Sequence, residues 1–180
     1  MADVLKVIKD RRTVRKYQNK PVSDELLNMI LEAGRWAQSW ANTQCWEVVV
    51  VKDQAVKEAL QKTVPSGNPS YNSIVTAPIV LCLCAKKNLA GYYKGNVCTH
   101  FGDWLLFDMG IFAQNIALTA HSLGLGTVIV GLLNHAEAKK IINLPDDYEL
   151  VALMPLGFPA ETPQAPPRKE IKSFVHYNKF

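Results

Sequence analysis

The sequence predicts an α+β fold in a single domain that spans residues 1–180. Three observations support this prediction. The chain is long enough to bury one sizeable core. Its composition, with 48% hydrophobic and 20% charged residues, is that of a globular protein. Segments with helical spacing alternate with short apolar runs, so that five expected helices are interleaved with four expected strands, as in a layered fold.

The expected helices are recognised by apolar residues that recur with helical spacing. In the second helix, Ser23 is a good N-cap, and Asp24 and Glu25 follow in the first turn, where the helix dipole favours negative charge. The fourth helix is apolar on most of its faces, as is typical of a helix inside a core or at an oligomer interface. The five expected ranges are 3–11, 24–37, 54–60, 103–123 and 135–144.

The expected strands are short apolar runs, most of them rich in β-branched residues. They are WEVVVV (46–51), APIVLCLCA (77–85), GLGTVIVG (124–131) and YELVALMPLG (148–157). The third run opens with closely spaced glycines, but these precede the strand, whereas a dinucleotide-binding fingerprint follows a strand and opens a helix. The order of these features therefore excludes a Rossmann domain.

The C-terminal segment, about 158–180, predicts an extended arm because its first half is rich in proline. Such an arm loses conformational entropy unless it packs on something. Its end is nevertheless apolar, with Phe174, Val175, Tyr177 and Phe180. Together with the apolar fourth helix, this end favours a homodimer in which each arm wraps across the partner subunit.

Charge and cysteine content exclude several classes of protein. A net charge of +4 does not argue for nucleic acid. The N terminus lacks the apolar segment of a signal peptide, and no apolar run approaches the roughly 20 residues that a spanning helix needs. The cysteines form no CxxC pair and show no ligand spacing with histidines, which predicts neither a metal site nor a disulfide framework. We expect a soluble, cytoplasmic protein without nucleic-acid or membrane partners.

The segment RRTVRKY, residues 11–17, gathers four cations close to the N terminus. One interpretation is a solvated charged face. The other is a phosphate site: in an extended chain Arg11, Thr13 and Arg15 project to one side, and a guanidinium pairs bidentately with phosphate oxygens. The residues alone leave both interpretations open.

A second candidate, QSWANTQCW at 38–46, places short polar side chains beside two indoles. It is either a loop with a buried tryptophan or the polar rim of a site for an aromatic ligand. No Ser-His-Asp order and no paired-carboxylate motif is present, so no catalytic side chain is assigned. An enzyme with this sequence would depend on a bound cofactor for its chemistry.

Taken in order, these segments resemble the nitroreductase family of FMN-dependent oxidoreductases. RRTVRKY followed by PVSDELL resembles the family's arginine motif and first long helix, and AQSWANTQCWEVVVV resembles its next loop and strand. The apolar helix with its glycine turn, and the tail with PPRK, complete a match from about residue 8 to the C terminus. The resemblance implies a sandwich with a central, mostly antiparallel sheet flanked by helices, in an intertwined homodimer with FMN at the interface.

The resemblance also implies which residues would bind FMN. The arginine motif and the tail arginine would take the phosphate and ribityl end, the tryptophan segment would come from the partner subunit, and the glycine-turn backbone would face the N5 and O4 edge of the flavin. By position these residues are Arg11, Arg12, Thr13, Arg15, Arg168, Ser39, Trp40, Asn42, Val130 and Gly131.

The chain departs from the family pattern at several positions. Gln38 and Cys45 stand where the family usually has prolines, and Pro166 stands where a second tail cation often lies, so Lys169 is a candidate substitute. A polar residue before the second strand commonly touches the flavin ring. The sequence does not choose among the three candidates Asn68, Ser70 and Asn72.

The implied activity is a ping-pong reaction: NADH or NADPH gives hydride to FMN, and a nitroaromatic, quinone or similar small acceptor then takes the electrons. The alternative is a flavin-binding relative with another role, such as reductive dehalogenation, flavin fragmentation, or a non-enzymatic flavin carrier or sensor. The preferred nicotinamide, the physiological acceptor and the source of the proton are not predicted by any motif.

Overall fold

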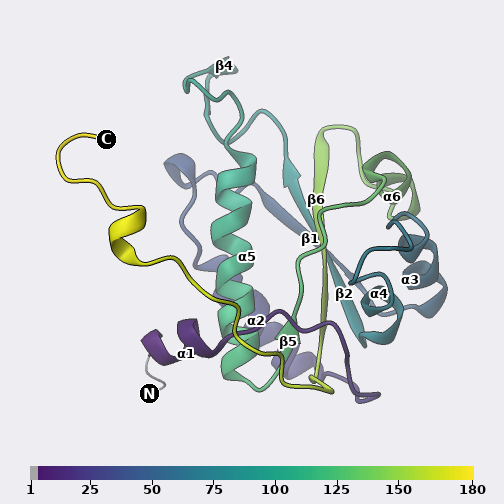
Figure 1. Ribbon diagram of the computed structural model, residues 1–180. Helices are drawn as coiled ribbons and strands as arrows, with labels where there is room; N and C mark the ends of the chain where they lie inside the picture. Colours follow the sequence, from purple (N-terminus) through teal and green to yellow (C-terminus); the bar gives the residue numbers. More distant parts are fainter. Residues whose placement is uncertain (1–3) are drawn as a thin grey trace.

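The computed structural model describes residues 4–180 and has the predicted α+β sandwich architecture (Figure 1). Its central sheet has the strand order β1-β2-β6-β5, and all three pairings are antiparallel, which confirms the predicted sheet. The four strands are β1 (Trp46–Val51), β2 (Ile79–Lys86), β5 (Gly126–Thr127) and β6 (Tyr148–Gly157).

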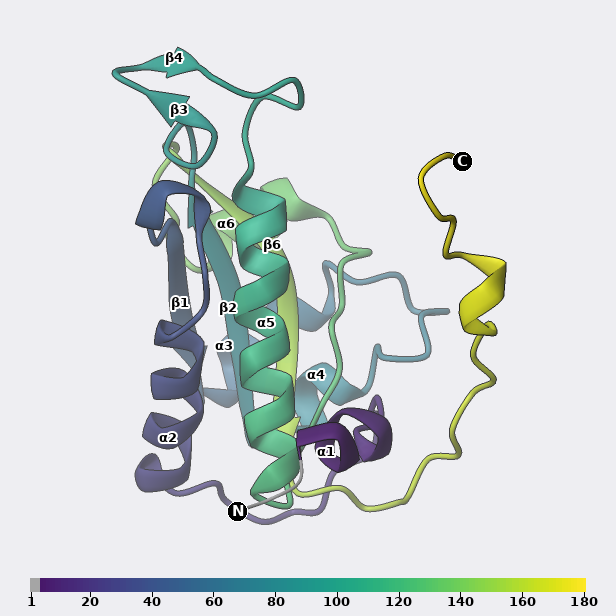
Figure 2. The same cartoon turned by 90° about the vertical axis from the view of Figure 1, so that its left-hand side faces the viewer.

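Helices cover both faces of the sheet (Figures 1 and 2). On one face lie α2 (Asp24–Arg35) and α5 (Leu105–Ser122), with α1 (Val4–Asp10) crossing near the end of α5. The other face carries α3 (Gln54–Gln61), α4 (Ser73–Thr76) and α6 (His135–Ile141). The predicted helix 3–11 extends to residue 3, which lies outside the described residues.

Local sequence signals set the starts of two helices, one of them at the predicted N-cap Ser23. The Ser23 hydroxyl accepts the Leu26 N–H at 3.3 Å, and a carboxylate oxygen of Asp53 accepts the Val56 N–H at 2.9 Å. Between the helices, β2 is buried on both faces: Leu81 packs in the core under α2 and α5, and Cys82 packs in the core under α3 and α6. This explains why β2 reads as a continuous apolar run and not as an alternating one.

The predicted third strand, 124–131, is wrong over most of its length. Of this run, only β5 pairs continuously with β6. Further along the chain, a single bridge between Val130 and Leu153 pairs it with β6 again. The register places Pro155 opposite Val128. A proline has no N–H to donate, so the ladder is interrupted there.

A hairpin of β3 (Tyr92–Tyr93) and β4 (Asn96–Val97), which the sequence did not indicate, projects from the body between β2 and α5 (Figure 2). It carries Cys98, which is exposed, whereas Cys82 and Cys84 of β2 are buried. Within residues 4–180 no group of His, Cys, Asp and Glu could hold a metal ion. In the same part of the chain, no helix has the length and apolar character to cross a membrane.

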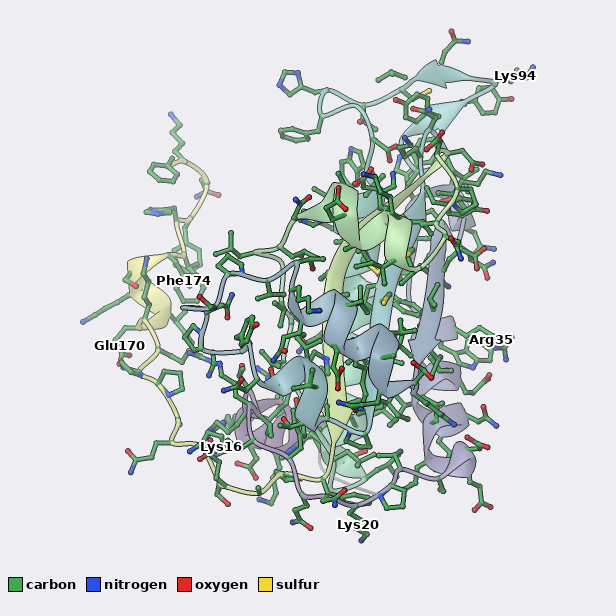
Figure 3. All side chains as sticks on the ribbon, turned by 90° about the vertical axis from the view of Figure 1, so that its right-hand side faces the viewer. Lys16, Lys20, Arg35, Lys94, Glu170 and Phe174 are labelled. Carbon is green, nitrogen blue, oxygen red and sulfur yellow. The ribbon has the colours of Figure 1, made fainter. Side chains whose placement is uncertain are left out.

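Beyond β6 the chain leaves the body as the extended arm that the sequence predicted (Figure 1). The arm contains one short 3₁₀ turn, η2 (Ile171–Ser173). Its apolar side chains are exposed, and Tyr177 is 85% accessible. Figure 3 shows Phe174 on the arm, apart from the body of the molecule. Packing of this arm on a partner subunit stays a prediction.

Candidate functional site

Residues 11–17 run as an extended segment beside β5. The Val14 N–H donates to the Thr127 carbonyl at 3.0 Å, in a parallel bridge that continues at Thr13. The Tyr17 hydroxyl lies 2.7 Å from the Val14 carbonyl and 3.1 Å from that of Pro155. Because Val14 is buried, the alternation of an extended chain turns Arg11, Thr13 and Arg15 outward.

These outward side chains line two adjoining cavities, which together we call the arginine trough. Arg11, Thr13 and Arg15 border both cavities. One has a volume of about 330 Å³ and is completed by Arg12 and Arg168 together with residues of the arm. The structure thus brings together the five residues that the sequence assigned to a phosphate.

The second cavity of the arginine trough, about 210 Å³, lies between segment 11–15 and α5. It is bordered by Gln114 and Ala117 of α5 and by the residues that begin the interrupted strand. Ile129 is 56% exposed beside it. A ligand with its anionic end at Arg168 and its body toward Gln114 would fit along the trough.

The electrostatics of the trough favour an anion. Burial, followed by the nearby charges of Arg168 and Arg12, lowers the pKa of the Arg11 guanidinium. Within residues 4–180, none of the four arginines of the trough forms an ion pair with a carboxylate. A phosphate bound among them would relieve this repulsion and accept charge-assisted hydrogen bonds.

Of the three polar candidates in the loop before β2, Ser70 is the one that contacts an arginine of the trough, although it borders neither cavity. Its hydroxyl accepts a hydrogen bond from Arg15 Nε at 3.2 Å. Asn68 contacts Ser70 and not the arginine, since its side-chain oxygen accepts the Ser70 N–H at 2.8 Å. Asn72 is exposed at the start of α4. Spacing along the sequence could not separate these candidates, whereas the fold places one of them, Ser70, against Arg15.

In the backbone that follows the glycine turn, Val130 is hydrogen-bonded within the sheet, whereas the N–H of Gly131 is free among the described residues. The Val130 N–H donates to the Leu153 carbonyl at 2.8 Å, and the Val130 carbonyl accepts the Leu153 N–H at 3.0 Å. Val130 therefore has no free backbone donor for the predicted flavin contact. Gly131 keeps a free N–H within the described chain, while its carbonyl lies 3.2 Å from His135 Nε2.

The remaining predicted residues lie on a separate loop, residues 39–45, which we call the tryptophan loop. It contains the short 3₁₀ turn η1 (Trp40–Asn42). None of its residues borders the arginine trough of the same chain, and it lies at the opposite end of the molecule from α1 (Figures 1 and 2). The structure does not bring Ser39, Trp40 and Asn42 together with the arginines of their own chain.

The Nitroreductase family model matches residues 8–158 of the sequence. The chain belongs to the nitroreductase family. This confirms the resemblance predicted from its motifs.

Known proteins agree with this assignment. A Methanothermobacter thermautotrophicus protein, whose name joins NADH dehydrogenase and NAD(P)H nitroreductase, is 34% identical over 165 residues, 89% of this chain and 80% of that protein. The crystal structure of nitroreductase A from Vibrio parahaemolyticus has a TM-score of 0.85 and 31% identity, and covers 100% of this chain and 77% of its own. An FMN-dependent nitroreductase from Clostridium difficile has a TM-score of 0.82 and 25% identity, over 98% and 99% of the two chains.

For this nitroreductase family member, sequence reasoning missed two residues near the predicted sites. Gln114 borders the trough but reads in the sequence as one polar residue of an apolar helix. Asp108, also on α5, is buried beneath the tryptophan loop. Neither stands in a recognisable motif, and only the folded helix shows what each one faces.

Proposed function

We propose that this protein is a cytoplasmic NAD(P)H-dependent FMN oxidoreductase that reduces a nitroaromatic, quinone or similar small acceptor by a ping-pong mechanism. Its predicted oxidoreductase class, FMN cofactor and nicotinamide donor are confirmed by the family and by the names of its relatives. The acceptor and the order of the two half-reactions are our proposal.

The observation that supports FMN binding most directly is the arginine trough. Arg11, Arg15 and Arg168 converge on one cavity without carboxylate partners among the described residues. In our assignment they hold the phosphate, and the Thr13 hydroxyl lies beside the ribityl chain. When bound, FMN supplies a ring that accepts hydride from the nicotinamide and passes electrons to the acceptor.

The rest of the site follows from the groups that border the second cavity. We assign the free Gly131 N–H to the polar edge of the flavin and Ser70, which touches Arg15, to the ring side of the trough. Among the residues 4–180 that border either cavity, none is a carboxylic acid, histidine or cysteine. We therefore assign no side chain as acid or base, and the proton of the product comes from solvent.

A homodimer would complete the site, with Ser39, Trp40 and Asn42 of each tryptophan loop in the site of the other subunit. The loop's distance from its own trough supports this arrangement. So do the apolar side chains left uncovered on α5, where Leu106 is 65% and Phe107 60% exposed, and on the arm. Exposed apolar side chains that gather on two elements of a chain are typical of an interface between its copies.

The decisive test compares Arg15→Ala and Arg168→Ala with Lys16→Ala. Lys16 is a cation of the same segment, but it is exposed and pairs with Glu161 at 2.9 Å. Loss of a charge-assisted phosphate contact costs about 1.5–3 kcal/mol, so FMN should bind roughly 10- to 150-fold more weakly to each arginine variant. The Lys16 variant should bind FMN normally, as measured by quenching of flavin fluorescence.

Equal FMN affinity in all three variants would refute the phosphate assignment. Steady-state oxidation of NADH and NADPH, with menadione or a nitroaromatic as acceptor, tests the activity on the wild-type protein. FMN bound without turnover by either nicotinamide would favour the alternative, a flavin-binding relative with another role.

A further inference from the structure

We propose that Asp108 is a positioning residue that fixes the tryptophan loop in the conformation with which it meets the FMN of the partner subunit. This inference rests on the proposed function, because the loop's place in the partner's site is part of that proposal. Asp108 itself touches neither the arginine trough nor, in our assignment, the flavin.

Asp108 is a buried carboxylate whose contacts lead to the loop. It lies in the first turn of α5 and is 1% exposed. Both of its oxygens lie 3.1 Å from the Trp40 backbone nitrogen, whose N–H they share. In the part of the chain that the structure describes, no lysine or arginine pairs with it. Burying a carboxyl group without a cationic partner is unfavourable, so such a group is expected where the hydrogen bonds that it accepts are needed.

The rest of the loop is hydrogen-bonded mainly to itself. The Asn42 N–H donates to the Ser39 carbonyl at 3.1 Å, and the Gln44 N–H donates to the Ser39 hydroxyl at 3.0 Å. At its far end, the Cys45 carbonyl accepts the Lys86 N–H at 2.8 Å and so joins the sheet. The loop is thus held together by its own hydrogen bonds, and Asp108 is the residue through which it is hydrogen-bonded to α5.

The loop also holds an unfavourable backbone conformation. Ala41, Asn42 and Gln44 have φ values of 46°, 55° and 49°, in the left-handed region that non-glycine residues avoid. Three such residues within four positions persist only where the surroundings over-determine them, and such strain gathers at ligand-binding sites. The exposed Asn42 side chain, which accepts a hydrogen bond from Gln44 Nε2 at 3.3 Å, is displayed by this turn.

Cys45 provides a second hydrogen bond between the same loop and Asp108. Its sulfur lies 3.8 Å from Asp108 Oδ2, within hydrogen-bonding distance for a thiol. Burial, reinforced by the Asp108 charge, raises the pKa of the Cys45 thiol to about 12, so the thiol keeps the proton that it donates. A proline, which the family usually has at this position, could not make this contact. Asp108 therefore receives donors from both ends of the loop, the Trp40 N–H and the Cys45 S–H.

A positioning role can be separated from a merely structural one. Burial raises the pKa of Asp108, so the folded chain binds this proton more tightly than the unfolded chain does. Stability then falls as the pH rises from the ordinary value through the raised one. Asp108→Asn removes the carboxyl group whose ionisation burial disfavours, so electrostatics give no reason for this variant to have a lower melting temperature at neutral pH.

The first experiment measures FMN affinity and melting temperature at pH 7 for Asp108→Ala, Asp108→Asn and a matched control, Asp103→Asn. Asp103 lies at the same end of α5, but its oxygens accept N–H groups of Leu105 and Asn88 at 2.9 and 2.7 Å and not those of the loop. We expect Asp108→Ala to weaken FMN binding by about tenfold or more, Asp108→Asn by less, and Asp103→Asn not at all.

Unchanged FMN affinity in Asp108→Asn and Asp108→Ala would overturn the inference, whatever the melting temperatures. If Asp108→Ala fails to fold, Asp108→Asn alone decides between the two outcomes. Cys45→Ala, which removes the second donor, should give an effect in the same direction as Asp108→Asn.

The second experiment mixes subunits that carry Asp108→Ala with subunits that carry Arg15→Ala and measures FMN bound per mixed dimer. If the loop serves the partner's site, both defects fall in one site and the other site is intact, so one FMN binds with wild-type affinity. If the loop serves its own chain, each site carries one defect and neither binds normally, which would overturn the inference. Wild-type FMN binding by the Arg15→Ala homodimer would instead refute the proposed phosphate site and leave the Asp108 result standing.

Discussion

Residues 11–17 and the C-terminal arm both supply arginines to the trough, yet the chain holds these two regions in opposite ways. The N-terminal segment is paired with β5 through Val14 and anchored by the buried ring of Tyr17. Among the described residues, the arm is bonded to the body at its base alone, through Phe158, Pro159, Ala160 and Glu161. Beyond Glu161, every hydrogen bond described in the arm is made within the arm.

The proposed phosphate site therefore has one side that the fold of its own chain builds, and we expect its other side to depend on what the arm packs against. Arg11 and Arg15 are in place as soon as the domain folds. Arg168 borders the same cavity, but we expect it to be held there firmly only when the exposed aromatic end of the arm packs on a surface, since an extended segment without packing has no compensation for its lost entropy. Cofactor binding and subunit assembly should therefore be coupled through Arg168.

Removing the end of the arm should give the largest effect. A chain that stops after Lys169 keeps Arg168 but loses the apolar residues beyond it, including Phe174 and Tyr177. We expect the protein to become mainly monomeric and to lose more FMN affinity than Arg168→Ala does, above about 150-fold. Light scattering after gel filtration and FMN titration check both results. A truncated chain that remains dimeric with normal FMN binding would show that the arm needs no partner surface.

Gly126→Ala should have an intermediate effect, because it disturbs the packing of segment 11–17 against β5. A Cβ at this position would lie 2.4 Å from Val14 Cγ2 and 2.6 Å from Val14 Cβ, which a stiff valine cannot easily avoid. Overpacking of this kind lowers the free energy of unfolding by about 1–3 kcal/mol. Urea denaturation should show this loss, together with weaker FMN binding.

The matched control for Gly126→Ala is Gly67→Ala, where an added Cβ would meet nothing within 4 Å. Its unfolding midpoint should stay close to that of the wild type. If the two variants behave alike, contact between Val14 and β5 is not what holds the segment in place.

Ser70→Ala should have the smallest effect. It removes the acceptor of the Arg15 Nε hydrogen bond and leaves the backbone pairing of segment 11–17 unchanged. Such a bond contributes about 0.5–1.5 kcal/mol, which corresponds to roughly a 2- to 12-fold loss of FMN affinity. Ser66→Ala, in the exposed part of the same loop, serves as the control. A loss as large as that of Arg15→Ala would mean that Ser70 itself contacts the phosphate.

Signals within one turn or one strand were enough to predict much of the fold. Ser23 and Asp53 cap their helices as their positions indicate, and the apolar runs of β1 and β2 are strands. The shortening of β5 could not be predicted, because it depends on Pro155 standing across the sheet, some 30 residues along the chain, and on a register that only the folded sheet defines. The two-residue strands of the hairpin are too short to carry any periodicity.

Some features of the candidate site also follow from the local sequence pattern, whereas others depend on the folded sheet. Alternation along RRTVRKY correctly turns Val14 inward and Thr13 outward, because an extended segment has a fixed period. The free backbone donor at Gly131 and the used one at Val130 follow from pairing with β6, which no local pattern reveals. The left-handed conformations of Ala41 and Gln44 are equally hidden, since neither residue type indicates them.

The distribution of thiols has a practical consequence for following this molecule in solution. Burial raises the pKa of Cys45, Cys82 and Cys84 to about 12, which leaves these sulfurs protonated and out of reach of reagents. Cys98, exposed on the hairpin, is the one accessible cysteine in the described chain. A maleimide spin label would therefore attach to the hairpin without any engineered substitution, and in the proposed homodimer the two labels would report a single intersubunit distance.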